Sequence, residues 1–266
     1  MTLPPVFDQN HYASLNAARE AVLHPLLEGV RRNLNIETAL DVGCGAGYFS
    51  GVLHAEGFRV IGLDGRPQNV ALAASRYPQV QFCAANLEED EVCKHGPADV
   101  VLCFGLLYHL ENPFRAIRNL RALTGKVLLL ESMCLPAGSP VMELRDECLS
   151  EDQGLQFVAF YPSEACLTKL LYRAGFLYVY RLRKNPEHHA YRNSPRQKRS
   201  RIMLVASVTE LDLAQIQLVA EPSSEPNPWR TTWDRLGAPL RRLGRLLHKP
   251  WPEKVASVRK RLSGSV

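Results

Sequence analysis

A glycine-rich segment at residues 38–50 has residue types and spacing that could hold a small ligand against the backbone. It begins as a short apolar run, which is typical of a buried parallel strand, and apolar residues return at helical spacing from Phe49 onward. Three alternate glycines separate the two patterns: Gly43, Gly45 and Gly47. Because glycine accepts a positive φ and has no Cβ, a ligand can lie against bare main chain at the positive end of the following helix. The segment therefore predicts a strand, a tight turn with a ligand site, and a helix.

The residues around this turn favour a cationic ligand over a pyrophosphate. A dinucleotide-binding turn reads G-x-G-x-x-G, whereas here the third glycine comes one residue early and Tyr48 occupies the place of a glycine. Asp41 precedes the first glycine by two residues, where its charge would attract a cation and repel a phosphate. S-adenosylmethionine carries a sulfonium and an ammonium group and no phosphate, so it fits this pattern better than a nicotinamide dinucleotide.

The form D-V-G-C-G-x-G resembles the first motif of the class I S-adenosylmethionine-dependent methyltransferases. The resemblance implies that S-adenosylmethionine is the methyl donor. It implies that five residues of the turn contact this donor: Asp41, Gly43, Cys44, Gly45 and Gly47. Within this set, we interpret Cys44 as a tolerated small residue and not as a nucleophile.

The next two strands end in residues that could hold the adenosine. Asp64 ends a predicted strand at residues 59–64 and lies 21 positions after Gly43, where a carboxylate can accept from both ribose hydroxyls. A solvated loop acid is the alternative. The resemblance places Gly65 and Arg66 beside the adenosine, and Asn86 and Leu87 at the adenine after a third strand. The family usually has an acid at the position of Asn86; an amide still accepts a hydrogen bond but contributes no charge.

The fourth predicted strand spans residues 99–104. The segment that follows it carries the candidate catalytic residues. The resemblance adds Phe104, at the end of this strand, to the donor site. His109 is the candidate general base, because an imidazole with an ordinary pKa of about 6.5 is neutral and basic at cellular pH. Tyr108 could hydrogen-bond the donor or shape the pocket. The alternative for His109 is that it only caps the next helix.

The chemistry of methyl transfer demands little of the side chains. The reaction is an in-line displacement with a neutral leaving group, so orientation in a dry pocket can supply most of the rate and a base is optional. Family members that modify exocyclic nitrogens carry an Asn/Asp-Pro-Pro-aromatic turn after the fourth strand, and residues 105–110 lack it. This difference favours an oxygen or another nucleophile as the methyl acceptor.

The elements that position these residues predict a Rossmann-like α/β fold. We expect a seven-stranded, mostly parallel sheet with helices on both faces and an antiparallel last strand, in a donor-binding domain at residues 38–208. An N-terminal arm at residues 7–12 and a helix at 16–30 form the preceding segment, residues 1–37. Residues 132–161 are irregular in pattern, and we predict that they form an insertion over the acceptor pocket. Residues 176–183 and 201–208 are predicted to be the last two strands, paired antiparallel.

The C-terminal part has a different character. We predict a linker at residues 209–228 and a basic amphipathic segment at 229–266, which holds all three tryptophans. The net charge of the chain is +5, and ten Lys or Arg against two acids in this last segment account for it. Such a segment is typical of contact with a membrane surface or a partner. The alternatives are a helix folded back onto its own domain and a disordered tail.

Composition excludes several other classes of protein. The seven cysteines are scattered without a C-x-x-C pair, so we expect reduced thiols and neither a disulfide framework nor a zinc site. The adjacent His188 and His189 lack a spaced Cys or acid, and we expect no metal there. The first residues contain no basic segment followed by an apolar run, and no run of about 18 apolar residues occurs. We therefore expect a cytoplasmic protein, with peripheral contact to the inner membrane face as a further possibility through residues 229–266.

One subgroup of the family is closer in its motifs than the others. Residues 104–109, 129–132 and 161–176 resemble, in the same order, segments of the bacterial enzymes that alkylate 5-hydroxyuridine at the tRNA wobble position. This resemblance covers about residues 38–183, and bacterial methyltransferases acting on sugars or lipid-linked intermediates share the same motifs. Three functions remain open: an O-methyltransferase for a small-molecule, glycan or lipid-linked acceptor, which we favour; a tRNA-modifying enzyme; and a non-catalytic protein that binds S-adenosylmethionine.

Overall fold

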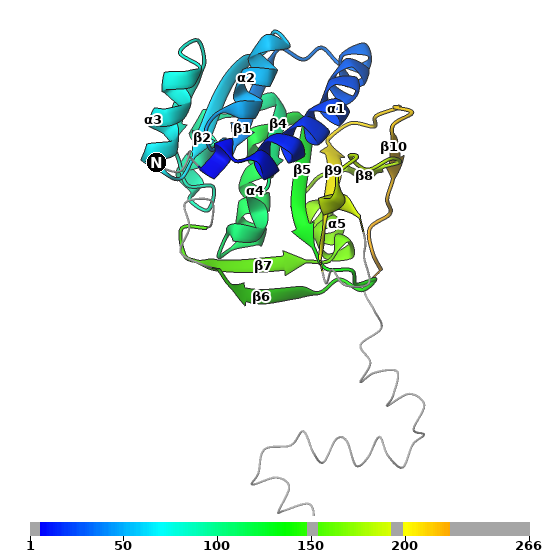
Figure 1. The fold of residues 1–266 in the computed structure, drawn as a ribbon. Coiled ribbons are helices and arrows are strands. Elements are labelled where there is room, and N and C mark those ends of the chain that lie inside the picture. The colour runs from blue at the N-terminus through cyan, green and yellow to red at the C-terminus, as the bar shows by residue number, and fades with distance from the viewer. Residues whose placement is uncertain (1–5, 148–153, 193–198, 224–266) are drawn as a thin grey trace, which may run out of the picture. The chain divides into compact units, whose positions relative to one another are not determined.

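The computed structural model describes residues 6–147, 154–192 and 199–223 (Figure 1). The described residues up to 222 belong to one compact unit. The predicted amphipathic segment at 229–266 lies outside the described residues. No helix in the described part of the chain has the length and apolar content that crossing a membrane requires.

The compact unit is a mixed α/β fold. Its helices are α1 (Asn10–Asn33), α2 (Tyr48–Ala55), α3 (Pro67–Arg76), α4 (Pro113–Leu123) and α5 (Glu164–Arg173), with short 3-10 turns at Val6–Asp8, Asp90–His95, Leu107–His109 and His189–Tyr191. Its strands are β1 (Thr38–Val42), β2 (Arg59–Asp64), β3 (Gln81–Ala84), β4 (Ala98–Phe104), β5 (Thr124–Cys134), β6 (Met142–Asp146), β7 (Val158–Pro162), β8 (Tyr178–Leu182), β9 (Ser200–Ser207) and β10 (Ile216–Leu218).

Eight of these strands form one sheet in the order β10-β8-β9-β5-β4-β1-β2-β3. The strands from β5 to β3 in this order are paired in parallel, whereas β9 is antiparallel to both β5 and β8. The predicted Rossmann-like α/β class, the mostly parallel sheet and the antiparallel pairing of the last two predicted strands are confirmed.

Helices cover both faces of this sheet. Apolar residues of α1 and α2, among them Leu23, Leu27 and Leu53, pack on one face with less than 2% of their surface exposed. On the other face Ile117 and Leu120 of α4 and Leu171 of α5 are equally buried. The spacing of these residues places them on one side of each helix, which is why the helices lie against the sheet.

The prediction of seven strands is wrong, because β10 adds an eighth at the edge of the sheet. Ile216 pairs with Leu182 of β8 and is 3% exposed, and Leu211 and Leu213 before it are also buried in the core. The core therefore continues past residue 208, into the segment predicted to be a linker. A strand of three residues is too short for the alternation of apolar and polar residues to be recognised in the sequence.

Two further elements differ from their predicted form. Helix α1 is longer than residues 16–30, and it includes Tyr12, which was expected in the arm before the helix. The segment at 132–161 is less irregular than its sequence pattern indicates, since β6 and β7 pair antiparallel within it. Figure 1 shows this two-stranded sheet lying across the lower end of the main sheet in that view.

The order of the strands fixes where a ligand can bind. The chain passes from β1 to β2 on one side and returns to β4 on the other, so the loops after β1 and β4 diverge at the carboxyl end of the sheet. Open α/β sheets bind their ligands in the crevice at such a switch point. This edge carries the glycine turn and residues 105–110.

Candidate functional site

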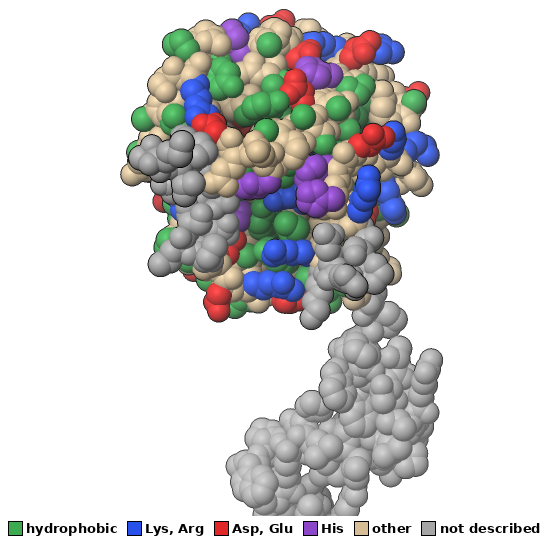
Figure 2. Space-filling model, viewed as in Figure 1, with side chains coloured by type: hydrophobic (Ala, Val, Ile, Leu, Met, Phe, Trp, Pro, Cys, Tyr) green, Lys and Arg blue, Asp and Glu red, His purple; other side chains and the backbone are tan. Residues whose placement is uncertain are grey.

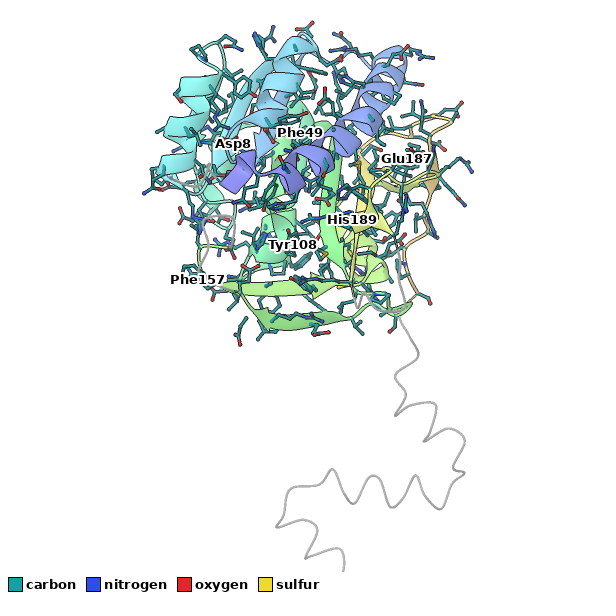
Figure 3. The ribbon with its side chains drawn as sticks, viewed as in Figure 1. Asp8, Phe49, Tyr108, Phe157, Glu187 and His189 are labelled. Carbon is teal, nitrogen blue, oxygen red and sulfur yellow. The ribbon has the colours of Figure 1, made fainter. Side chains whose placement is uncertain are left out.

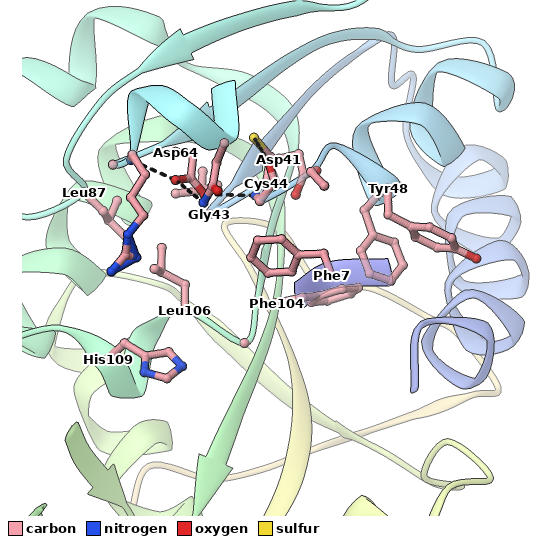
Figure 4. A pocket seen from close by; sticks show the side chains of 18 of the residues that line it. Phe7, Asp41, Gly43, Cys44, Tyr48, Asp64, Leu87, Phe104, Leu106 and His109 are labelled. Carbon is pink, nitrogen blue, oxygen red and sulfur yellow. Dashed lines mark hydrogen bonds between the residues drawn. The ribbon is translucent and has the colours of Figure 1, made fainter. Parts of the chain in front are cut away.

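A pocket opens at this switch point. Figure 4 shows it from close by, with the turn after β1, the loop after β4 and Phe7 of the first 3-10 turn around it. Most of the predicted site residues line it together: Asp41, Gly43, Cys44, Gly45, Asp64, Gly65, Arg66, Asn86, Leu87, Phe104, Tyr108 and His109. The fold thus brings together predicted site residues from the ends of four different strands.

The turn after β1 requires glycine at its first two glycine positions. Gly43 and Gly45 have φ of +76° and +52°, a region that favours glycine. A Cβ on Gly43 would lie 2.9 Å from side-chain atoms of Leu106, and a Cβ on Gly45 would lie 3.2 Å from Phe7. Both positions therefore keep the main chain bare where the turn borders the pocket.

Gly47 does not line the pocket, so its predicted contact with the donor is not supported by the structure. It has a φ of +85° and immediately precedes α2. A Cβ there would lie 3.0 Å from Ala73 of α3 and from Tyr77. The third glycine thus allows α2 and the end of α3 to pack closely.

Asp41 is buried beneath the turn, with 3% of its surface exposed. The Ser50 hydroxyl donates to its Oδ2 at 2.7 Å. Burial raises the pKa of Asp41 to about 6, and the nearby charge of Asp64 acts in the same direction against the hydrogen bond from Ser50. Burial destabilises the ionised form of Asp41. A cationic ligand beside it would stabilise this form, since an opposite charge favours ionisation.

The carboxylate of Asp64 ties the two neighbouring strand ends together. Its Oδ2 accepts from the backbone N–H of Gly45 at 2.9 Å, and its Oδ1 accepts from the backbone of Arg66 at 2.9 Å and the amide of Asn69 at 3.0 Å. An ionised carboxylate has further lone pairs on each oxygen, so it can still accept from a ribose hydroxyl. The alternative of a freely solvated loop acid does not agree with these bonds.

The other predicted donor residues form the walls of the pocket. The side chain of Asn86 is engaged in its own turn, where its Oδ1 accepts from the backbone of Glu88 at 3.1 Å. Leu87 is 3% exposed, and Phe104 packs edge-to-face on Phe49 at 5.0 Å between ring centroids. Burial raises the pKa of the Cys44 thiol far above its ordinary value, which agrees with its interpretation as a small packing residue.

Beyond the turn, a buried cluster of charges forms the wall nearest Tyr108. Glu131 of β5 accepts from Nη2 of Arg19 at 2.7 Å and from Nη1 of Arg201 at 3.0 Å. Nη2 of Arg201 donates to the hydroxyl of Tyr108 at 3.0 Å, and the Tyr108 ring lies edge-on to Tyr161 at 5.7 Å. Figure 3 shows Tyr108 between α1 and the β6–β7 pair. The cluster fixes the Tyr108 ring in place.

The charges in this cluster are stabilised by one another. Burial alone would raise the pKa of Glu131, but the charges of Arg19 and Arg201 outweigh burial and lower it. Burial raises the pKa of the Tyr108 hydroxyl, so this group stays neutral.

In Figure 2, Lys or Arg and His side chains surround a hollow on the face of the molecule that is in view.

His109 lies next to Tyr108, with 4.0 Å between the ring centroids, and beside Leu106 (Figure 4). Its Nδ1 is 2.5 Å from Oε1 of Glu147, whose side chain is only 3% exposed. The other carboxylate oxygen of Glu147 accepts from the backbone N–H of Gly154 at 2.9 Å. His109 therefore has a buried carboxylate partner, and the proposal that it only caps a helix leaves this pairing unexplained.

Sequence reasoning missed several residues of this site. Glu147 and Gly154 lie in the segment that was predicted only as an insertion. Arg19 lies 112 residues from its partner Glu131, and Arg201 lies 93 residues from its partner Tyr108. For Arg201 the available signal was a charged residue in an otherwise apolar strand, since ionisable residues are rarely buried unless paired. In the described residues no cluster of three or more His, Cys, Asp or Glu side chains could hold a metal ion.

Comparison with known proteins agrees with this architecture. Solved structures with the same fold include the N-terminal domain of EvdMO1 with S-adenosylhomocysteine bound, with a TM-score of 0.59 and 20% identity over 75% of this chain and 84% of that one. A second is 1,6-didemethyltoxoflavin-N1-methyltransferase of Burkholderia thailandensis, with a TM-score of 0.52 and 22% identity over 74% of this chain and 79% of that one. At these identities the two structures show the fold alone.

Curated relatives match shorter parts of the chain. A probable S-adenosylmethionine-dependent methyltransferase of Mycobacterium tuberculosis is 36% identical over 35% of this chain and 34% of its own length. A tRNA U34 carboxymethyltransferase of Shewanella sediminis is 30% identical over 54% of this chain and 45% of its own. A ubiquinone biosynthesis O-methyltransferase of Rickettsia conorii is 30% identical over 41% and 38%. The matched region thus spans less than half the length of each of these relatives.

A family model matches a longer part of the chain than any of these relatives does. Residues 15–180, more than half of the chain, match the model described as a methyltransferase domain. This match includes the glycine turn, both acids at the strand ends and the loop with Tyr108 and His109. The chain therefore belongs to the methyltransferase-domain family, within the class of S-adenosylmethionine-dependent methyltransferases that its first motif predicts.

Proposed function

We propose that this protein transfers a methyl group from S-adenosylmethionine to an oxygen of a small-molecule, glycan or lipid-linked acceptor. The observation that carries the proposal is the position of His109. This imidazole borders the same pocket as the glycine turn, and its Nδ1 is engaged by Glu147 at 2.5 Å. Its Nε2 is then the nitrogen that can take up a proton from an acceptor hydroxyl.

The residues of the glycine turn suit a cationic donor. Gly43 and Gly45 keep the main chain bare, Asp41 supplies a buried negative charge, and Asp64 lies at the neighbouring strand end. The charge of Asp41 opposes the binding of a pyrophosphate beside the turn. Asp64, Asn86 and Leu87 would hold the adenosine, with Phe104 at the methionine part of the donor.

The remaining steps belong to the side chains around the acceptor. S-adenosylmethionine supplies an electrophilic methyl group whose C–S bond breaks as the new O–C bond forms, and the bonding electrons remain on a neutral sulfur. His109 takes the acceptor proton at Nε2, which contributes about 10²–10⁴-fold where a base is used. Tyr108, held by Arg201, shapes the pocket, and the buried aromatic rings exclude water from it.

The acceptor class can be tested directly. The purified protein is incubated with donor labelled in its methyl group and with fractionated lysate, and the label is followed into lipid, RNA and small molecules. Base-stable label in a small-molecule, glycan or lipid fraction supports the proposal. Label in protein or on nucleobase nitrogens contradicts the O-methylation. Saturable donor binding without turnover on any fraction would favour the non-catalytic alternative.

A tRNA-modifying activity is the second candidate. It is supported by the tRNA U34 carboxymethyltransferases, which match at 28–30% identity. Arg145 and Arg199 both lie over the ring of Tyr161, at 5.1 and 5.4 Å from its centre, and supply positive charge near the pocket. RNA binding by such residues should weaken steeply with added salt, which an electrophoretic or anisotropy titration measures.

Residues 229–266 supply a separate proposal about location. Their basic and tryptophan-rich sequence favours peripheral contact with an anionic membrane surface, as part of an otherwise cytoplasmic protein. Liposome flotation of the full chain and of a chain ending at residue 228 tests this. Flotation that does not depend on residues 229–266, or no flotation at all, contradicts it.

A further inference from the structure

We propose that Glu147 is a positioning residue that holds His109 in the tautomer that can accept a proton from the methyl acceptor. The inference rests on the proposed function, because it gives the His109 base a partner from outside the motif that suggested it. Glu147 belongs to the connection between β6 and β7, which no sequence pattern linked to catalysis.

The hydrogen bonds at Glu147 leave one tautomer. An ionised carboxylate only accepts hydrogen bonds, so Nδ1 of His109 must carry the hydrogen that joins it to Oε1 at 2.5 Å. In the neutral ring Nε2 is then a bare acceptor. The pair is well shielded from water, with 9% of the His109 side chain and 3% of the Glu147 side chain exposed. Shielding strengthens the bond and limits competition from solvent.

A second contact fixes the carboxylate itself. Oε2 of Glu147 accepts from the N–H of Gly154, and the backbone N–H of Glu147 donates to the carbonyl of Phe157 at 2.9 Å. A Cβ on Gly154 would lie 2.3 Å from the carbonyl oxygen of His109, so only glycine allows this approach. Both ends of the β6–β7 connection are thereby held against the segment that carries His109.

The same connection also reaches the predicted adenosine site. Nη2 of Arg66 donates to the carbonyl of Gly154 at 3.3 Å, and a Cβ on Gly65 would lie 3.1 Å from Leu155. Gly154 and Leu155 both line the pocket. The part of the chain that orients the base is thus in contact with the loop that follows Asp64.

Replacing Glu147 with Gln should invert the tautomer. The amide has one oxygen for two donors, the N–H of Gly154 and Nδ1–H of His109. If the oxygen stays with Gly154, the amide nitrogen donates to Nδ1 and the hydrogen of the imidazole moves to Nε2. The base then faces the acceptor with a hydrogen in place of a lone pair. Glu143→Gln is the matched control, because Glu143 lies on β6 and its side chain is 49% exposed.

The test is a long-range ¹H–¹⁵N spectrum of the full chain with ¹⁵N-labelled histidine, in which a His109→Gln variant assigns the signal. We expect the Nδ1–H tautomer in the unmodified protein, the Nε2–H tautomer or a mixture in Glu147→Gln, and no change in Glu143→Gln. An Nε2–H tautomer in the unmodified protein overturns the proposal, even if Glu147→Gln fails to fold. An unchanged His109 signal in a folded Glu147→Gln variant also overturns it.

Two further readouts separate this inference from the proposed function. Affinity for S-adenosylhomocysteine, measured by calorimetry, should be unchanged in Glu147→Gln, whereas no affinity in the unmodified protein would contradict the proposed function and leave the tautomer result standing on its own. With the acceptor in hand, Glu147→Gln should lower kcat by about 10²–10⁴-fold at an unchanged donor KM, as for the loss of a general base. A loss confined to KM would contradict a role in positioning the base.

Discussion

Arg19 of α1 and Glu131 of β5 form an ion pair with 2.7 Å between Nη2 and Oε2, in which 6% and 0% of the two side chains are exposed. Arg201 of β9 contacts the same carboxylate, so one acid from the centre of the sheet joins a helix and a neighbouring strand. Because Arg201 also donates to Tyr108, this pair links the stability of the fold to the shape of the pocket.

We predict that Glu131→Ala lowers the free energy of unfolding by about 3–5 kcal/mol, since removing one partner leaves buried charge without compensation. Chemical denaturation monitored by circular dichroism measures the change. The control is Glu37→Ala, because Glu37 is 58% exposed and its pair with Arg59 spans 3.3 Å. That change should stay within about 1 kcal/mol. Equal effects of the two substitutions would show that the buried cluster contributes no more than a surface pair.

Affinity for the cationic donor should depend on pH through Asp41. Burial raises the pKa of Asp41 to about 6, so below that pH the carboxyl is increasingly protonated and loses its attraction for a sulfonium or ammonium group. We expect affinity for S-adenosylmethionine to fall as pH is lowered from about 7 to 5, approaching tenfold per unit. Calorimetry across this range measures it, and Asp41→Asn should remove the dependence together with part of the affinity. A flat profile in the unmodified protein would exclude Asp41 from this role.

Gly45→Val should abolish donor binding. Gly45 has a φ of +52° and its N–H donates to Asp64, so a branched side chain would strain the turn and fill space next to Phe7. Calorimetry with S-adenosylhomocysteine measures binding, and a thermal melt confirms folding. Gly138→Val is the control, because a Cβ at Gly138 has no neighbour within 4 Å. Unchanged affinity in a folded Gly45→Val protein would refute the assignment of the turn.

Gly154→Ala should disturb both halves of the site at once. A Cβ would lie 2.3 Å from the carbonyl oxygen of His109, so the β6–β7 connection must move away and release its bonds to Glu147 and Arg66. We expect weaker binding of S-adenosylhomocysteine and, in the histidine spectrum, a loss of the single tautomer of His109. Gly138→Ala serves as the control. If only the tautomer changes, the contact with Arg66 does not support the donor site.

The parts of this site that sequence predicts are those encoded by neighbouring residues. Asp41, Gly43 and Gly45 lie within five positions, and their spacing alone indicates a strand, a turn and a cationic ligand. Asp64 ends one recognisable strand and His109 comes shortly after another, so their position at the edge of the sheet follows from the parallel topology. The mostly parallel sheet and the antiparallel pairing of its last two predicted strands were predicted, whereas the edge strand β10 was not.

The parts that sequence did not predict depend on contacts between distant segments. Glu147 pairs with His109 across 38 positions, and Glu131 joins residues on either side of it by 112 and 70 positions. The residues next to an acid in the sequence do not indicate which basic side chain it will pair with in the fold. Gly47 belongs to the recognisable motif, but it does not line the pocket. A Cβ at this position would meet Ala73 of α3.

Isothermal titration of the full chain with S-adenosylmethionine, S-adenosylhomocysteine and NAD⁺ shows whether the pocket at the glycine turn takes a sulfonium donor or a dinucleotide. We predict saturable, one-to-one binding of the first two ligands and none of the dinucleotide, because the pocket joins bare main chain to the buried carboxylate of Asp41. Binding of NAD⁺ or a flavin nucleotide, with no uptake of either sulfur compound, would contradict it.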